Sequence, residues 1–309
     1  MEKILQEISD QIKELAVSSG FTDCGIAPAG RLAEDAVRLK KWLEEGMHAG
    51  MKYMENYFDK RTDPSLLVPG AKSVIVVLLN YFPEQSQKKQ NNLILSKYAY
   101  GQDYHPVMKT MLKQLMQSIN DKITPLQGRV FVDSAPVLER ALASMAGLGW
   151  TGKNANLISP KHGSFCFIGE IITDVELDYN KQAVPDFCGS CRKCIEACPT
   201  NAIIADRVID SRKCISYWTI EHKGEIDSSL KGKFENRIFG CDICQDVCPW
   251  NRKAQHNTIN EFHPSPDLIN MARKDWQELT EEKFNTLFHE SAVRRTGYDG
   301  LMRNIGFVT

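Results

Sequence analysis

The chain has 309 residues, of which 42% are hydrophobic and 25% are charged. This composition is typical of a globular protein and excludes a largely disordered, fibrous or collagen-like chain. Lys and Arg together number 38 against 39 for Asp and Glu, a formal net charge of -1, so no overall field attracts nucleic acid or a membrane surface.

No apolar run approaches the roughly 20 residues that a membrane-spanning helix needs. The segment that follows Met1 is amphipathic and lacks the apolar core of a signal peptide. We therefore expect a cytoplasmic protein without a membrane partner. At roughly 150 residues per domain, the length predicts about two domains.

Helical and strand patterns alternate through the first 180 residues. We expect helices over 4–16, 32–43, 107–123 and 137–146, and strands over 21–27, 73–79, 129–133 and 164–173. The run 73–79 is continuously apolar, which is typical of a central strand buried on both faces. The alternation predicts an α/β (α+β) domain over 1–180.

Eight of the ten cysteines lie within residues 188–248. Cytosolic redox conditions disfavour disulfides, so thiolates crowded into one stretch indicate metal. Four of them form the C-x2-C-x2-C-x3-C-P motif of bacterial ferredoxins, in which three thiolates hold one cluster and the fourth ligates its neighbour. These four are Cys188, Cys191, Cys194 and Cys198.

A second motif follows, with Cys241, Cys244 and Cys248 before Pro249, and Cys214 is its fourth ligand. The motifs exchange their last cysteines. We therefore predict one 4Fe-4S cluster on Cys188, Cys191, Cys194 and Cys248, and another on Cys198, Cys214, Cys241 and Cys244. A ferredoxin-like domain is expected over 181–252, and helical periodicity predicts a helical C-terminal segment over 253–309.

A pair of zinc sites is the alternative for these cysteines. Zinc ribbons usually separate two C-x2-C pairs widely, whereas three cysteines in x2 steps suit a cubane. Cys24 and Cys166 lie in apolar strand contexts, and we expect them to be small buried hydrophobes without a ligand role. Two clusters alone specify electron transfer and no substrate.

Five segments carry a resemblance to one known family. They are 100–105 (YGQDYH), 132–134 (VDS), 149–154 (GWTGKN), 217–222 (YWTIEH) and 239–251 (FGCDICQDVCPWN). In these the chain resembles the epoxyqueuosine reductases, and the resemblance covers nearly its whole length. It implies a cobalamin-dependent enzyme with two 4Fe-4S clusters that reduces epoxyqueuosine to queuosine at the wobble position of tRNA.

The resemblance also implies a cobalamin-binding domain over 1–180 that is related to reductive dehalogenases. The C-terminal segment is then the start of a helical-repeat region that binds tRNA. The expected electron donor is a low-potential protein such as flavodoxin, or ferredoxin with its reductase. The alternatives are a reductive dehalogenase-like enzyme and a two-cluster electron-transfer protein without a corrin.

Residue roles follow from the same resemblance. Asp133 matches the proton donor, which requires a carboxyl kept neutral by a pKa that burial raises; the alternative is that it only caps a helix. Residues expected to face the cofactor are Tyr57, Lys97, Asp133, Lys153, Asn154, Ser159 and Tyr217. Residues expected to contact tRNA are Tyr104, His105, Arg140, His222 and Lys223, with helix entry or a solvated basic loop as the alternative explanations.

Overall fold

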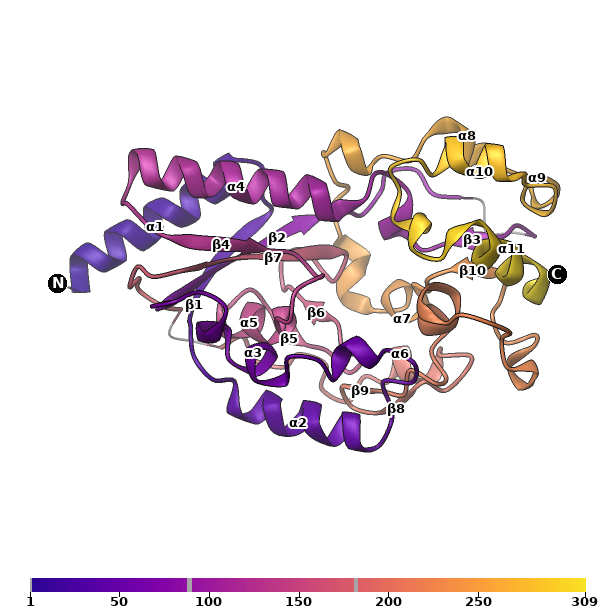
Figure 1. Cartoon of the computed structure of the whole chain (residues 1–309), viewed down its shortest axis with the longest axis horizontal. Coiled ribbons are helices and arrows are strands. Elements are labelled where there is room, and N and C mark those ends of the chain that lie inside the picture. The colour runs from indigo at the N-terminus through magenta and orange to yellow at the C-terminus, as the bar shows by residue number, and fades with distance from the viewer. Residues whose placement is uncertain (1, 88–90, 181–182) are drawn as a thin grey trace.

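A four-stranded antiparallel sheet forms the centre of the first half of the chain. The computed structural model describes residues 2–87, 91–180 and 183–309. The strands are β1 (Asp23–Pro28), β2 (Ser73–Asn80), β7 (Cys166–Thr173) and β4 (Gly128–Phe131), in that spatial order (Figure 1). Seven of the eight residues of β2 are buried, as expected for a strand covered on both faces.

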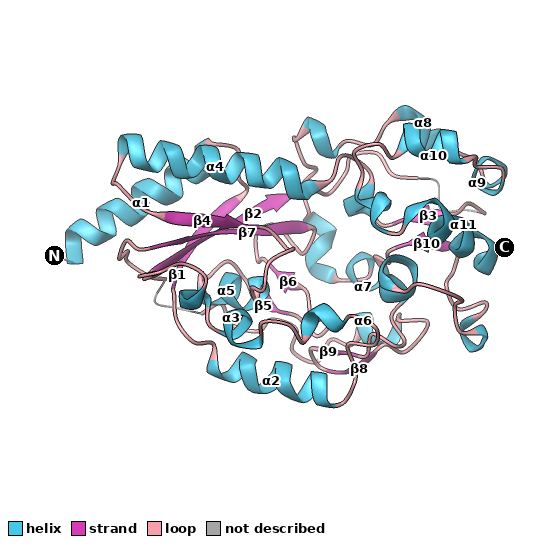
Figure 2. Ribbon diagram, in the orientation of Figure 1, coloured by secondary structure: helices cyan, strands magenta, loops and turns pink. Residues whose placement is uncertain are grey.

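Helices cover both faces of this sheet. On one face lie α1 (Glu2–Ser18) and α4 (Tyr104–Lys122), and on the other lie α5 (Glu139–Met145) and the outer helix α2 (Ala33–Glu44) (Figure 2). The short helix α3 (Phe58–Thr62) precedes β2. The layered arrangement confirms the predicted α/β class.

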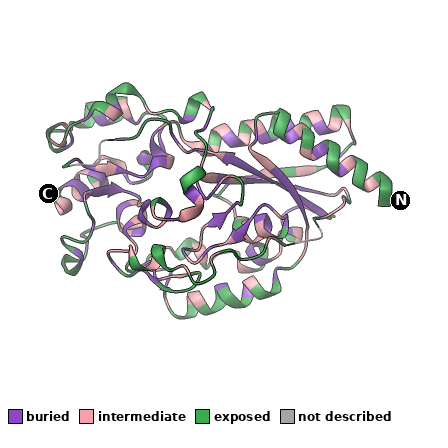
Figure 3. Ribbon diagram, turned by 180° about the vertical axis from the view of Figure 1, so that it is seen from behind, coloured by how far each residue is buried: buried purple, intermediate pink, exposed green. Residues whose placement is uncertain are grey.

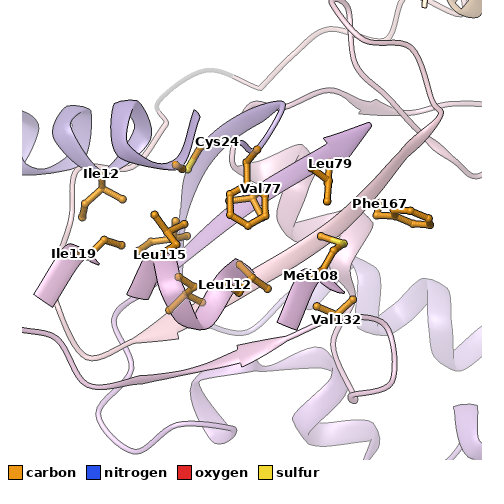
Figure 4. Packing of buried hydrophobic residues seen from close by; sticks show 14 of the residues in the cluster. Ile12, Cys24, Val77, Leu79, Met108, Leu112, Leu115, Ile119, Val132 and Phe167 are labelled. Atoms are coloured by element: carbon orange, nitrogen blue, oxygen red, sulfur yellow. The ribbon is translucent and has the colours of Figure 1, made fainter. Parts of the chain in front are cut away.

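The apolar stripe of α4 explains its place on the sheet. Met108, Leu112, Leu115 and Ile119 recur at helical spacing and are fully buried against the sheet (Figure 4). At Gly169 of β7 an added Cβ would stand 3.0 Å from both Met108 and Leu112, so glycine allows this close approach. Cys24 lies in the same core, as predicted from its apolar context. Cys166 is half-buried, and burial raises the pKa of its thiol to about 12.

Short elements surround the cysteine motifs. They are α6 (Lys193–Glu196), α7 (Ile243–Asp246), and the hairpins β5 (Trp150–Thr151) with β6 (Leu157–Ile158) and β8 (Ile203–Ala205) with β9 (Val208–Ile209). The predicted helical segment is present as α8 (Pro266–Asn270), α9 (Arg273–Gln277), α10 (Glu281–Leu287) and α11 (Gly297–Val308). None of the helices in the described ranges is long and apolar enough to cross a membrane.

One segment of the first half packs with the C-terminal helices. β3 (Ile94–Leu95) pairs in parallel with β10 (Arg237–Phe239). Leu95 and Phe239 belong to one buried cluster with Trp276 and Phe288. Figure 3 shows the inner strands of the central sheet, β2 and most of β7, as buried, while the outer faces of the helices are exposed. The segment 93–100 therefore ties the two halves together.

Candidate active site and cluster ligands

The first group of thiols lies between α6 and the end of α7, which pack against each other. Burial raises the pKa of Cys194, and Cys188 and Cys248 add to this rise. Burial likewise raises the pKa of Cys248, and Cys188 and Cys191 contribute. Thiols that shift one another's pKa lie close together. The structure thus brings together the four cysteines predicted for one cluster.

The second group is formed by the remaining four cysteines of the motifs. Burial raises the pKa of Cys214, and Cys198 adds to the rise. Burial raises the pKa of Cys241 to about 12, with Cys214 contributing. Burial raises the pKa of Cys244 well above its usual range, and Cys241 and Cys214 add to the rise. Bound iron reverses these shifts, because a coordinating thiol is deprotonated.

The donor set suits clusters better than single ions. All eight thiols are free. Within the described ranges, no three His, Cys, Asp or Glu side chains converge as ligands of one metal ion. In a cubane each thiolate binds a different iron, so its four ligands stand farther apart than around zinc.

Hydrogen bonds to the sulfurs come from segments that the motifs do not include. Trp150 Nε1 donates to Cys188 Sγ at 3.4 Å, and the Ala202 amide donates to Cys198 Sγ at 3.3 Å. Asn156 Nδ2 lies 4.0 Å from Cys244 Sγ. Such donors tune a cluster's potential. The sequence carries no signal that would single out Trp150 or Asn156 for this role.

Three predicted cofactor residues lie on the cluster side of the molecule. Lys153 Nζ pairs with Asp206 at 3.4 Å, and Asn154 Nδ2 donates to the Cys244 carbonyl at 3.4 Å. Ser159 is buried, and its hydroxyl finds no hydrogen-bond partner in the part of the chain that the structure describes. An unpaired buried hydroxyl suits a polar ligand group.

Lys97 is enclosed rather than solvated. Its side chain is 8% exposed, and its Nζ lies 2.5 Å from Asp246 and 3.4 Å from Asp242. The ammonium also stands 4.9 Å from the centre of the Phe165 ring. Two aspartates of the second cysteine motif therefore pair with the Lys97 charge, and the expectation that Lys97 faces the cofactor stays a prediction.

Tyr217 and Tyr57 differ sharply in exposure. Tyr217 is buried, and its hydroxyl accepts a hydrogen bond from the Gly50 amide at 2.9 Å. An added Cβ at Gly50 would stand 2.7 Å from that hydroxyl oxygen, so only glycine fits there. Tyr57 is 67% exposed and has a positive φ of 56° at the start of α3.

Asp133 lies at the turn between β4 and α5 with a positive φ of 50°. The Tyr104 hydroxyl donates to its carboxylate at 2.8 Å, and His105 Nε2 lies 3.2 Å from the same oxygen. His105 Nδ1 lies 2.6 Å from Asp103, whose side chain also caps α4 by accepting from the His105 amide. The Asp133 side chain is 59% exposed, so this carboxylate remains accessible.

The pKa of Asp133 corrects one expectation. Burial raises it, but hydrogen bonds from His105 and Tyr104 outweigh burial and hold the pKa below its usual range. Burial lowers the pKa of His105, but hydrogen bonds to Asp103 and Asp133 raise it to about 9. Near neutral pH the proton therefore sits on His105, and Asp133 is a carboxylate, not the neutral acid predicted.

Charged and aromatic groups near Asp133 come from distant parts of the chain. Arg295 forms two hydrogen bonds to Glu221, at 2.6 and 2.8 Å, and its guanidinium stands 5.9 Å from the centre of the Tyr53 ring. Glu221, Tyr53 and Asp133 all contribute to the raised pKa of Arg295, so these groups share one space. Sequence reasoning did not single out Arg295, because nothing near it marks a site.

The predicted tRNA residues fall into three places. Tyr104 and His105 flank Asp133, and one face of the Tyr104 ring stacks on Phe167 at 4.1 Å. His222 Nε2 lies 2.8 Å from the Glu225 carbonyl, and Lys223 Nζ donates to the Arg295 carbonyl. Arg140 is exposed, and it donates to the Ala155 carbonyl at 2.6 Å.

A cavity of about 290 Å³ is lined by residues that include Asn92 and Arg273 and does not include Asp133. The Asn92 amide already donates to the Met271 carbonyl. No titratable side chain other than Arg273 lines the cavity. We place the candidate active site at Asp133.

Two groups of four thiols, together with an accessible acid paired with an imidazole, indicate an iron–sulfur oxidoreductase. Residues 187–251 match the family model described as 4Fe-4S double cluster binding domain. Residues 61–134 match the one described as Epoxyqueuosine reductase QueG, DUF1730.

Curated relatives extend this likeness to nearly the whole chain. An epoxyqueuosine reductase of Cellulophaga algicola is 53% identical over 97% of this chain and 97% of its own length. That of Escherichia coli is 40% identical over 97% of this chain and 80% of its own length. The chain belongs to the epoxyqueuosine reductase family and is an oxidoreductase.

Solved structures show the same fold. An epoxyqueuosine reductase in complex with an epoxyqueuosine-modified stem loop of tRNA-Tyr superposes with a TM-score of 0.89, at 28% identity over 97% of this chain and 80% of that one. The enzyme from Streptococcus thermophilus gives a TM-score of 0.87 at 32% identity, with the same coverage.

Proposed function

We propose that this chain reduces epoxyqueuosine to queuosine at the wobble position of a tRNA. Electrons pass through two 4Fe-4S clusters to a bound cobalamin, and Asp133 supplies a proton. The observation that carries this proposal is the accessible Asp133 carboxylate, which is hydrogen-bonded to His105. The Arg295 guanidinium, paired with Glu221, is near enough for Asp133 to contribute to its raised pKa.

Residues beside the cysteine motifs suit the polar rim of a corrin. The unpaired Ser159 hydroxyl and the Asn154 amide are able to bind propionamide groups. Tyr57 and Lys153 are further candidates, whereas Lys97 and Tyr217 would act by holding the surrounding segments in place. When bound, cobalamin supplies low-potential two-electron chemistry at carbon, and the protein supplies binding and orientation.

The proton comes from a coupled pair of groups. His105 holds the proton near neutral pH, and Asp133 accepts its hydrogen bond. Asp133 therefore relays a proton from the imidazole to the epoxide oxygen. Tyr104 fixes the carboxylate through its hydroxyl. General acid catalysis of this kind typically contributes about 10²–10⁴-fold in rate.

The remaining assignments concern partners and organisation. A relative binds an epoxyqueuosine-modified tRNA stem loop, and we infer the same substrate here, with Arg140, His222 and Lys223 near the RNA backbone. A low-potential flavodoxin or ferredoxin supplies the electrons. The domains extend over 1–180, 181–252 and 253–309, and the protein acts in the cytoplasm.

The proposal is tested by Asp133→Asn in holoenzyme that is reconstituted anaerobically. We expect about eight irons and one cobalt per chain, as in the unaltered enzyme, but no queuosine by mass of the tRNA nucleoside. Full activity would remove Asp133 from the reaction. Iron without cobalt in the unaltered chain would favour a two-cluster electron carrier.

A further inference from the structure

A buried carboxyl lies behind the active site. Glu170 is fully buried in β7, where it pairs with Phe131 of β4 and Val76 of β2. Phe131 and Ile172 belong to the apolar cluster under α5, and alternation along the strand places Glu170 on the same face. Neither carboxyl oxygen has a hydrogen-bond partner among the described residues. A buried carboxyl without a cation or donor is neutral, because a lone charge there is too costly.

A second carboxyl connects Glu170 to the active-site turn. Glu139 is the first residue of α5, and its side chain accepts a hydrogen bond from the backbone N–H of Asp133. Burial and then the Asp133 carboxylate raise the pKa of Glu139 to about 8, against the opposing effects of that hydrogen bond, Arg140 and His105. Near neutral pH this carboxyl also carries a proton.

The charged groups around Glu170 provide no counter-ion for its carboxyl group. Burial, then Glu139 and Asp133, raise its pKa well above the usual range. Arg129 lies on the same strand as Phe131, but its guanidinium donates to the Leu67 carbonyl. Arg140 donates to the Ala155 carbonyl. Glu170, Glu139 and Asp133 thus act on one another electrostatically, from the buried strand β7 to the active-site turn.

We propose that Glu139 and Glu170 form a proton store behind Asp133: Glu139 reprotonates Asp133 during turnover, and Glu170 reprotonates Glu139. This rests on the proposed function. Conversion of an epoxide to an alkene breaks both C–O bonds, forms a C=C bond and releases the oxygen as water. It consumes two electrons, which the external reductant supplies, and two protons.

The proton balance requires a second proton in each turnover. The His105–Asp133 pair provides the first proton, which leaves the pair with no proton to give. The second proton moves from Glu139 to Asp133, directly or through one water molecule. Glu170 then returns a proton to Glu139, and solvent refills the store after the product leaves. Glu139 and Glu170 do not touch the substrate.

The simpler explanation is that Glu139 only holds the turn in which Asp133 has a positive φ. Glutamine separates the two roles, because its amide oxygen still accepts from the Asp133 N–H but cannot supply a proton at neutral pH. The variants are therefore Glu139→Gln and Glu170→Gln, with Glu139→Asp as the variant that keeps an acid. Iron and cobalt contents confirm that each variant is loaded.

The assay is single-turnover formation of queuosine by reduced holoenzyme, from about pH 6 to about pH 9. The unaltered rate should fall as the pH rises through about 8, where Glu139 loses its proton. Both glutamine variants should react at least about tenfold more slowly with unchanged tRNA affinity. In Glu139→Gln the rate should no longer fall at alkaline pH. Glu139→Asp should regain part of the rate. An unaltered rate and pH profile in either glutamine variant would overturn the store.

A second measurement does not depend on activity. The infrared difference between the unaltered protein and Glu170→Gln at pH 7 should contain the carbonyl stretch of one protonated carboxyl group. Its absence means that Glu170 is ionised and the store does not exist. Failure of the unaltered enzyme to form queuosine contradicts the proposed function instead, and the infrared result still decides whether Glu170 holds a proton.

Discussion

Replacement of Lys97 by methionine tests how the protein holds the second cysteine motif. The change removes the ammonium partner of Asp242, whose side chain is only 8% exposed. Breaking a buried ion pair from one side costs about 3–5 kcal/mol. Asp242 keeps hydrogen bonds from the Lys97 amide and the Ser96 hydroxyl, so we expect the lower end, about 3 kcal/mol.

The measurement is the apparent Tm of anaerobically loaded protein at one scan rate. At about 2–4 °C per kcal/mol, Lys97→Met should lower the apparent Tm by about 6–12 °C. Lys97→Met combined with Asp242→Asn should recover part of this loss, since the uncompensated charge is gone. Lys40→Met, which breaks only an exposed pair with Glu44, is the control and should change stability by less than about 0.5 kcal/mol. A Lys97→Met protein as stable as this control would refute the argument.

Three further outcomes are expected. Trp150→Phe removes the N–H donor to Cys188, a hydrogen bond worth about 0.5–1.5 kcal/mol. The reduction potential of that cluster should therefore fall by about 20–65 mV, at about 59 mV per tenfold change in the equilibrium constant. Redox titration measures the potential, with Trp250→Phe as the control, and equal potentials in the Trp150→Phe and unaltered proteins would contradict the prediction. Tyr104→Phe removes a donor that stabilises the Asp133 carboxylate, so the acidic limb of the pH–rate profile should move to higher pH, and an unmoved limb would exclude this role. Leu112→Ala should lower the free energy of unfolding by about 2–5 kcal/mol in denaturant titration, without a change in nucleoside specificity. A loss below about 1 kcal/mol would mean that the core repacks to fill the cavity left by the change.

Local patterns predicted much of the fold. The apolar run of β2 and the helical stripe of α4 specify their own burial, because both depend on residues close in the sequence. The cysteine spacing likewise predicted the double-cluster domain, and the assignment of each cysteine to a cluster stays a prediction. The helix over 107–123 begins three residues earlier, at Tyr104, because Asp103 caps it.

Other parts of the site depend on contacts between distant segments. Lys97 meets Asp246 only after the halves of the chain assemble, and Glu221 meets Arg295 across 74 residues of the second half. The neutral acid expected at Asp133 was wrong because the sequence did not reveal that His105 and Tyr104 would both bind its carboxylate. Pairings of this kind leave no periodic trace.

The pairing of β3 with β10 has a consequence for biosynthesis. Leu95 leaves the ribosome long before Phe239 and Trp276, with which it shares a buried cluster. Contacts so far apart in sequence form late, because a long loop must close first. All eight cluster thiols precede Trp276 in the chain, so every sulfur is synthesised before this buried cluster is complete.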